Sequence, residues 1–323
     1  MIDIKTKIVN LCMSGGRTSA YMAEKLLHLQ SVGYFQDTKF IITFANTGRE
    51  HEETLVFVNK CSERWLSIYG VNVVWLEAVV YRERIPSGHK EVCFESASRL
   101  GEPFEDVVSK YGLPNGNFLH CTRELKENPI LNYMESIGQS KGFIKNGALV
   151  PATYETFIGI RSDEQKRLKG NKSGKQEKVY PLAELLNKYD LDCDIRCVKY
   201  EVLDFWDDMP FNLELPEHLG NCIDCHKKSN KKLAMVYRDM GLNAFKFSGW
   251  LDYEYSYVKS QMIDGQLKKR KRFRGYMDTK ELIALFDLKN MDNKDRSEDE
   301  GGCSESCEPF MGGNIAKERI NNS

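Results

Sequence analysis

A glycine-containing loop near the start of the chain has the residue types of an anion-binding turn. Residues 14–19 read Ser-Gly-Gly-Arg-Thr-Ser, after the apolar run 8–13 and before a helical pattern over 20–29. A buried strand, a glycine turn and a helix start in this order turn backbone N–H groups and positive helix charge toward a phosphate. The spacing matches neither a P-loop nor a dinucleotide-binding turn, and an ordinary tight turn is the alternative. The residues expected to bind the anion are Ser14, Gly15, Gly16, Arg17, Thr18 and Ser19.

Cysteines form a second candidate centre. His120-Cys121 opens a predicted helix, and Cys222 and Cys225 form a C-x-x-C motif before another. Helix starts lower thiol pKa values, which favours metal binding. Three thiolates could hold an iron–sulfur cluster with one open iron, whereas zinc would need a fourth ligand such as His120 or His226. A redox dithiol or reduced core cysteines are the alternative.

Two polar segments follow predicted strands and should meet the loop at one sheet edge. Asn46-Thr47-Gly48 follows the first of these strands, and Gly159-Ile160-Arg161 ends the second. Ligands of open α/β sheets bind beyond the carboxyl ends of the strands. We therefore expect the first segment near a nucleotide base and ribose, and Arg161 on a phosphate or sulfate. A helix cap involving Glu50 and a surface salt bridge are the respective alternatives.

The apolar patterns predict an α/β fold. Strand and helix patterns alternate in the first half, which predicts a parallel sheet with right-handed crossovers. Residues 80–118 are expected to be irregular and 169–176 to form a mobile loop. The predicted strands are 8–13, 39–45, 71–79 and 152–160, and the predicted helices are 18–30, 50–69, 122–137, 181–188, 201–206 and 227–240.

The composition indicates an ordinary intracellular globular protein. The chain has 323 residues, a net charge of −1 and 10 cysteines. No run of about 18 apolar residues could span a membrane, and no export signal stands at the start, so we expect a cytoplasmic protein whose cysteines serve metal or thiol chemistry. The predicted parts are a nucleotide-binding α/β domain over 1–190, a smaller helical cysteine-containing part over 191–289 and a disordered tail over 290–323.

Two segments concentrate positive charge. Residues 166–178 read KRLKGNKSGKQEK, and 268–274 read KKRKRFR. Such runs could follow the phosphates of RNA or DNA, with Phe273 and Tyr276 as stacking groups. Solvated loops are the alternative.

Taken in order, these motifs resemble the phosphoadenosine phosphosulfate (PAPS) reductase family of the PP-loop, adenine nucleotide α-hydrolase-like superfamily. The cysteine pattern also looks like a group often found in phages and mobile elements. The resemblance implies a Rossmann-like sheet of the PP-loop type, a bound adenine nucleotide (ATP with Mg²⁺ in many members) and a 4Fe-4S cluster or zinc. It covers about residues 8–235 and is carried by SGGRTS at 14–19, Asn-Thr-Gly through Glu-Thr at 46–54, Gly-Ile-Arg at 159–161, Tyr-Pro-Leu at 180–182 and Val-Leu-Asp-Phe-Trp at 202–206.

The resemblance suggests ATP-dependent sulfur transfer to a nucleic-acid or nucleotide acceptor. ATP would sit on the loop, an acceptor oxygen would be adenylated, and sulfide would displace AMP. Arg161 and Lys126 would neutralise phosphate charge in the transition state. Thr18, however, stands where ATP-splitting members carry Asp.

Two alternatives remain open. One is a PAPS or adenylyl-sulfate reductase that uses a thioredoxin-type reductant, although the Glu-Cys-Gly-x-His motif of those enzymes is absent and Cys303 and Cys307 are the nearest substitutes. The other is a non-catalytic, zinc-containing module that binds a nucleotide or nucleic acid.

Overall fold

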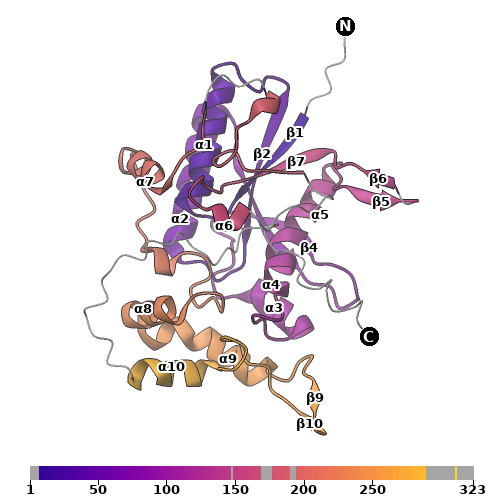
Figure 1. Ribbon diagram of the computed structural model, residues 1–323, viewed down its shortest axis with the longest axis vertical. Coiled ribbons are helices and arrows are strands. Elements are labelled where there is room, and N and C mark those ends of the chain that lie inside the picture. Colours follow the sequence, from indigo (N-terminus) through magenta and orange to yellow (C-terminus); the bar gives the residue numbers. More distant parts are fainter. Residues whose placement is uncertain (1–6, 147, 169–176, 190–193, 289–309, 311–323) are drawn as a thin grey trace.

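The computed structural model describes residues 7–146, 148–168, 177–189, 194–288 and 310. Its centre is a six-stranded sheet with the order β4-β3-β2-β1-β7-β8 (Figure 1). All neighbours in this sheet are parallel except β3 and β4. The strands are β1 (Lys7–Met13), β2 (Thr38–Asn46), β3 (Val73–Val79), β4 (Gly88–Val92), β7 (Tyr154–Ile158) and β8 (Glu177–Val179), and two small hairpins are β5 (Phe143–Lys145) with β6 (Ala148–Val150) and β9 (Met262–Ile263) with β10 (Gln266–Leu267). The expected α/β fold with a mostly parallel sheet is confirmed.

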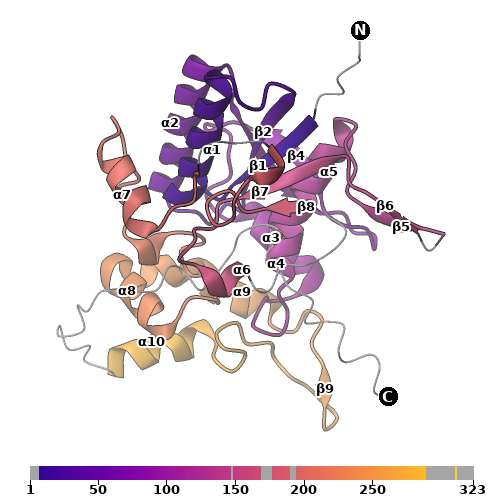
Figure 2. The same ribbon diagram turned by 45° about the horizontal axis from the view of Figure 1, so that its top comes forward.

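Helices cover both faces of the sheet. In Figures 1 and 2, α1 and α2 lie on one side and α5 on the other, while α8 to α10 lie beyond the carboxyl ends of the strands. None of the described helices is long and apolar enough to cross a membrane. The helices are α1 (Arg17–Ser31), α2 (Glu52–Tyr69), α3 (Glu102–Tyr111), α4 (His120–Thr122), a π-helical turn (Arg123–Glu127), α5 (Asn128–Ser136), α6 (Gln165–Leu168), α7 (Lys199–Asp207), α8 (Asn230–Met240), α9 (Lys246–Tyr255) and α10 (Thr279–Leu288).

Two expectations about these elements were wrong. Residues 80–118 were expected to be irregular but contain β4 and α3. The strand β4 is an edge strand with mostly exposed or half-buried side chains, so it lacks an apolar alternation. The predicted helix 181–188 is a set of turns followed by a 3-10 turn (Asn187–Tyr189), because the Leu182 carbonyl accepts from the Cys197 N–H at 3.1 Å instead of forming a helix bond.

Side chains from the two faces of β1 pack into different hydrophobic clusters, so the strand is buried on both sides. Val9 and Leu11 belong to the large cluster that includes α1 and α2, whereas Cys12 packs with Ile130 and Met134 of α5. Such alternation places successive side chains in different layers. The sheet edge that carries the loop is therefore held from both faces.

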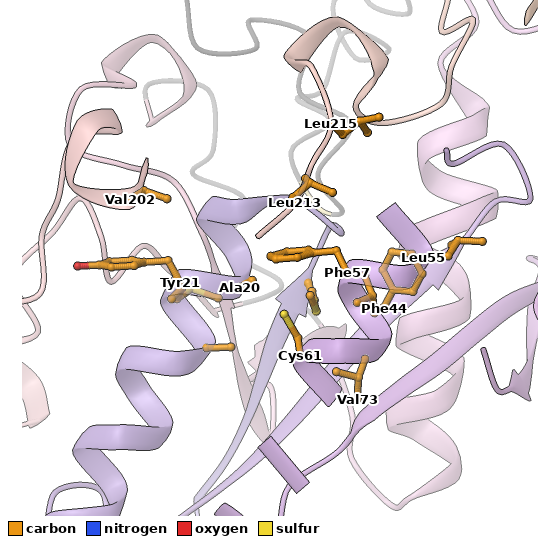
Figure 3. Close-up of a cluster of buried hydrophobic side chains, with 14 of the residues drawn as sticks. Ala20, Tyr21, Phe44, Leu55, Phe57, Cys61, Val73, Val202, Leu213 and Leu215 are labelled. Carbon is orange, nitrogen blue, oxygen red and sulfur yellow. The ribbon is translucent and has the colours of Figure 1, made fainter. Parts of the chain in front are cut away.

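The helical C-terminal part shares the larger cluster with the sheet. Trp206 of α7 is fully buried in it and donates from its indole N–H to the Arg17 carbonyl at 3.0 Å. Figure 3 shows Leu213, from the segment after α7, beside Phe57 of α2. The largest cluster therefore contains residues on both sides of position 190, the domain boundary predicted from the sequence.

One residue of the predicted disordered tail is part of the core. Phe310 is 5% exposed and belongs to the cluster on the α5 side of the sheet. Its N–H donates to the Glu127 carboxylate at 2.8 Å, and its carbonyl accepts from Lys178. Disorder is therefore the wrong expectation for Phe310. The rest of the tail beyond Leu288, and the loop 169–176 expected to be mobile, lie outside the described residues.

The end of β7 approaches the start of α1 so closely that only glycine fits between them. A Cβ atom at Gly159 would lie 2.8 Å from the Ser19 Cα and 3.1 Å from its nitrogen. Both neighbours are backbone atoms of the loop–helix junction and cannot rotate away. Gly159 therefore fixes the distance between β7 and the glycine loop.

We predict that Gly159→Ala lowers the free energy of unfolding by about 1–3 kcal/mol, since the added methyl group forces the strand and helix apart. Urea denaturation followed by tryptophan fluorescence measures this change. Gly116→Ala is the matched control, because a Cβ there meets nothing within 4 Å. Equal losses in the two variants would contradict the close approach.

Candidate functional site

The glycine loop borders a pocket of about 350 Å³ at the carboxyl edge of the sheet. This volume lies in the range of small-molecule sites. Four cationic and two acidic side chains line it. Its lining includes loop residues Ser14 to Thr18, the strand end Gly159 and Arg161, and Glu164, Arg167, Lys199, Val202, Leu203, Leu213, Leu215, Glu217, Gly220 and Asn221.

A left-handed glycine and the hydrogen bonds of Ser19 set the conformation of the loop. Gly15 has φ +84°, and a Cβ there would lie 2.6 Å from Thr54 Cγ2. The Ser19 hydroxyl lies 3.1 Å from the Ser14 N–H, from which it accepts, and donates to the Gly16 carbonyl at 3.0 Å. Gly16 is the N-cap of α1 and provides no side-chain cap. The first-turn N–H groups of α1 lack intrahelical partners, and such groups at a helix start can bind an anion.

Arg161 lies at the loop, as the sequence predicted. Its guanidinium donates to the Thr18 hydroxyl at 3.1 Å and to Asp163 at 2.9 Å. Glu164 lies 3.6 Å from Arg161 and pairs with Arg167 at 2.6 Å. Arg161 is thus fixed against the loop by two carboxylates, and an incoming phosphate would compete with them.

Arg17 has a structural role besides its place in the loop. Its side chain donates to the Asn212 amide oxygen at 2.7 Å and to the Leu213 carbonyl. These bonds hold the segment after α7 across the pocket.

The segment Asn46–Gly48 does not line the loop pocket. The Asn46 amide donates to Glu77 at 2.7 Å, and its oxygen accepts from the Gly48 N–H at 3.1 Å. The Thr47 hydroxyl donates to Glu50 at 2.9 Å and lies 3.4 Å from Cys222 Sγ. The strand end expected to hold a base is therefore a closed turn that faces the cysteines.

The three candidate cysteines surround one buried cavity of about 20 Å³, close to the volume of one water molecule. Each of the three is at most 9% exposed. Within the described residues, no three His, Cys, Asp or Glu side chains form a ready metal-binding group. The polar side chains that line the cavity are Thr47, Cys121, Thr122, Lys126, Cys222, Cys225, His226 and Arg272.

His120, one of the two histidines considered as a fourth ligand, does not line this cavity. It is buried, and its ring packs 5.5 Å from that of Tyr111. Burial, with Arg270 as the next cause, lowers the pKa of His120 to about 4. The histidine at the cavity is His226, whose pKa burial and Arg272 hold well below its usual value.

Burial favours the protonated thiol at two of the three cysteines, Cys121 and Cys222. Burial raises the pKa of Cys222 to about 12, and Glu50 adds to this effect. Burial also raises the pKa of Cys121, although Lys227 opposes it. A bound cation would reverse this balance, because a coordinating thiol is deprotonated.

Lys126 lies in this cavity and not at the loop, where we expected it to neutralise phosphate. Its ammonium is 3.9 Å from Glu50. It belongs to the π-helical turn that joins α4 to α5, a feature common at functional sites. Pro129, one turn later, has no N–H, so the regular bond to the Leu125 carbonyl cannot form. Pro129 was therefore the sequence signal for an irregular turn in the predicted helix 122–137, and the sequence analysis did not use it.

The basic segment 268–274 serves the fold. Arg270 donates to the Tyr111 carbonyl at 2.7 Å, and the fully buried Arg272 pairs with Asp224 at 3.2 Å. Phe273 is fully buried, so the expectation that it stacks on a base was wrong. Tyr276 remains exposed. Much of the other segment, 166–178, lies outside the described residues.

Asp224, inside the C-x-x-C motif, forms a buried ion pair that the sequence analysis missed. Arg272 lies 3.2 Å and Arg49 3.5 Å from its carboxylate. Burial alone would raise the pKa of Asp224, but the two arginines outweigh it and hold the pKa well below its usual range. Its contribution to stability is therefore present above the unfolded-state pKa of about 4 and is lost as the pH falls further.

We predict that Asp224→Asn costs about 3–5 kcal/mol at pH 7, since Arg272 is left buried without its carboxylate. The difference from the parent protein should shrink below about pH 4. Urea unfolding at pH 7 and pH 3 measures both effects. The control is Asp264→Asn in the exposed β9–β10 turn, and a pH-independent difference for Asp224→Asn would contradict the ion pair.

The comparisons with known proteins identify one relative over nearly the whole chain. The protein described as "Uncharacterized nin region protein ORF290" of Escherichia phage lambda is 31% identical over 315 residues, which cover 93% of this chain and 94% of that protein. No model of a known protein family matches. The chain belongs to the family of the lambda nin region protein ORF290.

Proposed function

We propose that this protein is an adenine-nucleotide-dependent sulfurtransferase of the PP-loop type. The nucleotide would bind in the loop pocket, and the sulfur chemistry would take place at Cys121, Cys222 and Cys225. The proposal is carried by the observation that the segment 220–222 connects the loop pocket to the cysteine cavity. Gly220 and Asn221 line the loop pocket, and the next residue, Cys222, lines the cysteine cavity.

The loop pocket supplies what a nucleotide needs. The uncapped start of α1 and Arg161 offer donors to phosphate oxygens. Val202, Leu213 and Leu215 line the same pocket and offer an apolar surface to a base. This placement of the base replaces the one expected at Asn46–Gly48. The nucleotide, with Mg²⁺ if it is ATP, would thus span from the loop to the segment after α7.

The cysteine cavity has the donor set of a metal centre. Three thiols from two parts of the chain line one buried space, and the cationic side chains of Lys126 and Arg272 line it as well. Its volume of about 20 Å³ accepts a single ion as it stands, so the thiols would move outward to hold a 4Fe-4S cluster. A cluster would supply iron-bound sulfur for transfer.

The remaining residues would position the reactants. Arg161 would hold the phosphates while the acceptor oxygen attacks the α-phosphate and the anhydride bond to the departing pyrophosphate breaks. The Gly159 contact would fix the distance between the strand end that carries Arg161 and the loop. Lys126 would balance negative charge beside Cys222, whose thiol has Glu50 and Thr47 as neighbours. An acceptor oxygen activated in the loop pocket would then lie next to the sulfur centre.

The size of the cavity favours one alternative, a zinc-containing nucleotide- or nucleic-acid-binding module, since one zinc ion needs less room than a cluster. The reductase alternative depends on a nucleophilic tail cysteine, and Cys303 and Cys307 lie outside the described residues.

Purification without oxygen tests the sulfur centre. We expect about four irons and four acid-labile sulfides per chain, with Cys222→Ala losing both, because a cluster needs its thiolate ligands. Cys93→Ala, at an exposed cysteine away from the cavity, should retain them. One zinc ion without sulfide in the parent protein would refute sulfur transfer.

Calorimetric titration with ATP tests the loop pocket. Arg161→Ala should weaken binding about 10- to 100-fold, the effect of losing a charge-assisted hydrogen bond of about 1.5–3 kcal/mol. Arg196→Ala removes an exposed arginine paired with Asp194 and should bind as the parent protein does. Circular dichroism checks that both variants fold. An unchanged affinity in Arg161→Ala would place the nucleotide elsewhere.

A further inference from the structure

We propose that His226 completes the metal centre as its fourth protein ligand, beside Cys121, Cys222 and Cys225. The inference rests on the metal centre of the proposed function and goes beyond it by naming a fourth protein ligand. With this ligand in place, the sulfur for transfer would come from a sulfide of the cluster and not from a group bound to an open iron. Of the two histidines considered from the sequence, His120 and His226, His226 is the one that lines the cavity.

The first observation is that a histidine lining the cavity has an unsatisfied ring nitrogen. His226 lines the cavity with the three cysteines and is 4% exposed. Its Nε2 is buried and has no hydrogen-bond partner among the described residues. An unpaired polar atom in the interior costs about 1–3 kcal/mol, and coordination would remove this cost.

The second observation is that no better donor lines the cavity. Lys126 and Arg272 have no lone pair in their charged forms. The Thr47 hydroxyl is already engaged with Glu50 at 2.9 Å, and the Thr122 hydroxyl accepts from the Lys227 ammonium at 3.2 Å. Among the side chains that line the cavity, the imidazole of His226 is therefore the neutral ligand available beside the thiols.

The third observation is that the backbone holds three donors in one rigid turn. The Cys225 N–H donates to the Cys222 carbonyl at 3.2 Å. The Lys228 ammonium donates to the Ile223 carbonyl at 2.9 Å, and Arg274 donates to the His226 carbonyl at 3.4 Å. The sequence Cys-x-x-Cys-His thus presents two thiols and one imidazole from a turn fixed on several sides.

His120 provides a matched control within the same molecule. It is also buried, directly precedes a cysteine of the centre and has an Nε2 without a hydrogen-bond partner among the described residues. It differs in that it does not line the cavity. A general effect of removing a buried histidine should therefore appear in both variants, and a ligand effect only in one.

The test compares the parent protein, His226→Ala and His120→Ala, each purified without oxygen. The measurements are metal and sulfide content, the absorption spectrum and the rate of metal loss to excess EDTA. We expect His226→Ala to lose metal about tenfold faster or more, and added imidazole to slow this loss. His120→Ala should match the parent protein.

A spectroscopic measurement on the parent protein needs no variant. With an iron–sulfur centre reduced to a paramagnetic state, ¹⁵N-histidine labelling should reveal a strong hyperfine coupling to one imidazole nitrogen. If the metal is zinc, substitution by cobalt allows the same measurement. The absence of this coupling would overturn the assignment even if His226→Ala failed to fold.

The outcomes separate the two proposals. A parent protein without bound metal refutes the metal centre and with it the inference. Bound metal that His226→Ala releases at the parental rate, with an unchanged spectrum, refutes the inference and leaves the cysteine centre intact. One zinc that is lost faster in His226→Ala supports His226 as the ligand but refutes sulfur transfer.

Discussion

The candidate site depends on the buried ion pairs that Asp224 forms with Arg272 and Arg49. The Asp224 carboxylate lies between Arg272, which is 1% exposed, and Arg49, which follows the turn at the end of β2. Burying charges is costly, and removing one partner of a buried ion pair leaves the charge of the other uncompensated. Such a pair is a means of fixing geometry. It fastens the C-x-x-C turn to the sheet edge and to the chain that precedes α10, so three distant segments meet beside the cysteines.

The sheet edge explains why two centres lie side by side. The ends of β1 and β7 form the loop pocket with Gly15 and Arg161, and the end of β2 closes into a turn against Cys222. These strands are neighbours in the parallel sheet, so their carboxyl ends share one edge. The helical C-terminal part, which shares the core through Trp206, supplies the opposite walls of both spaces.

The sequence predicted the elements that depend on local patterns and missed those that depend on distant partners. The strand–loop–helix unit at 8–29 and the proximity of Arg161 follow from apolar runs and from the topology of parallel sheets. The roles of Asn46 and Arg272 do not, because Asn46 bonds to Glu77 on the adjacent strand and Arg272 to Asp224, 48 residues away. A basic run looks the same whether its arginines face solvent or a buried carboxylate. Similarly, both histidines adjoin a cysteine, and only packing decides which one faces the cavity.

The charges at the cysteine cavity bear on the metal centre that we propose. Lys126 has Glu50 as its counterion and Arg272 has Asp224, so these four charges balance. Burial favours the neutral thiol of Cys121 and Cys222 by raising the pKa of each. Binding a divalent ion or a 2+ cluster to three thiolates adds one net negative charge. Lys227, which lowers the pKa of Cys121 against the effect of burial, is placed to offset it. In the proposed centre, the neutral imidazole of His226 would add a ligand without adding charge, whereas a fourth thiolate would add one more negative charge.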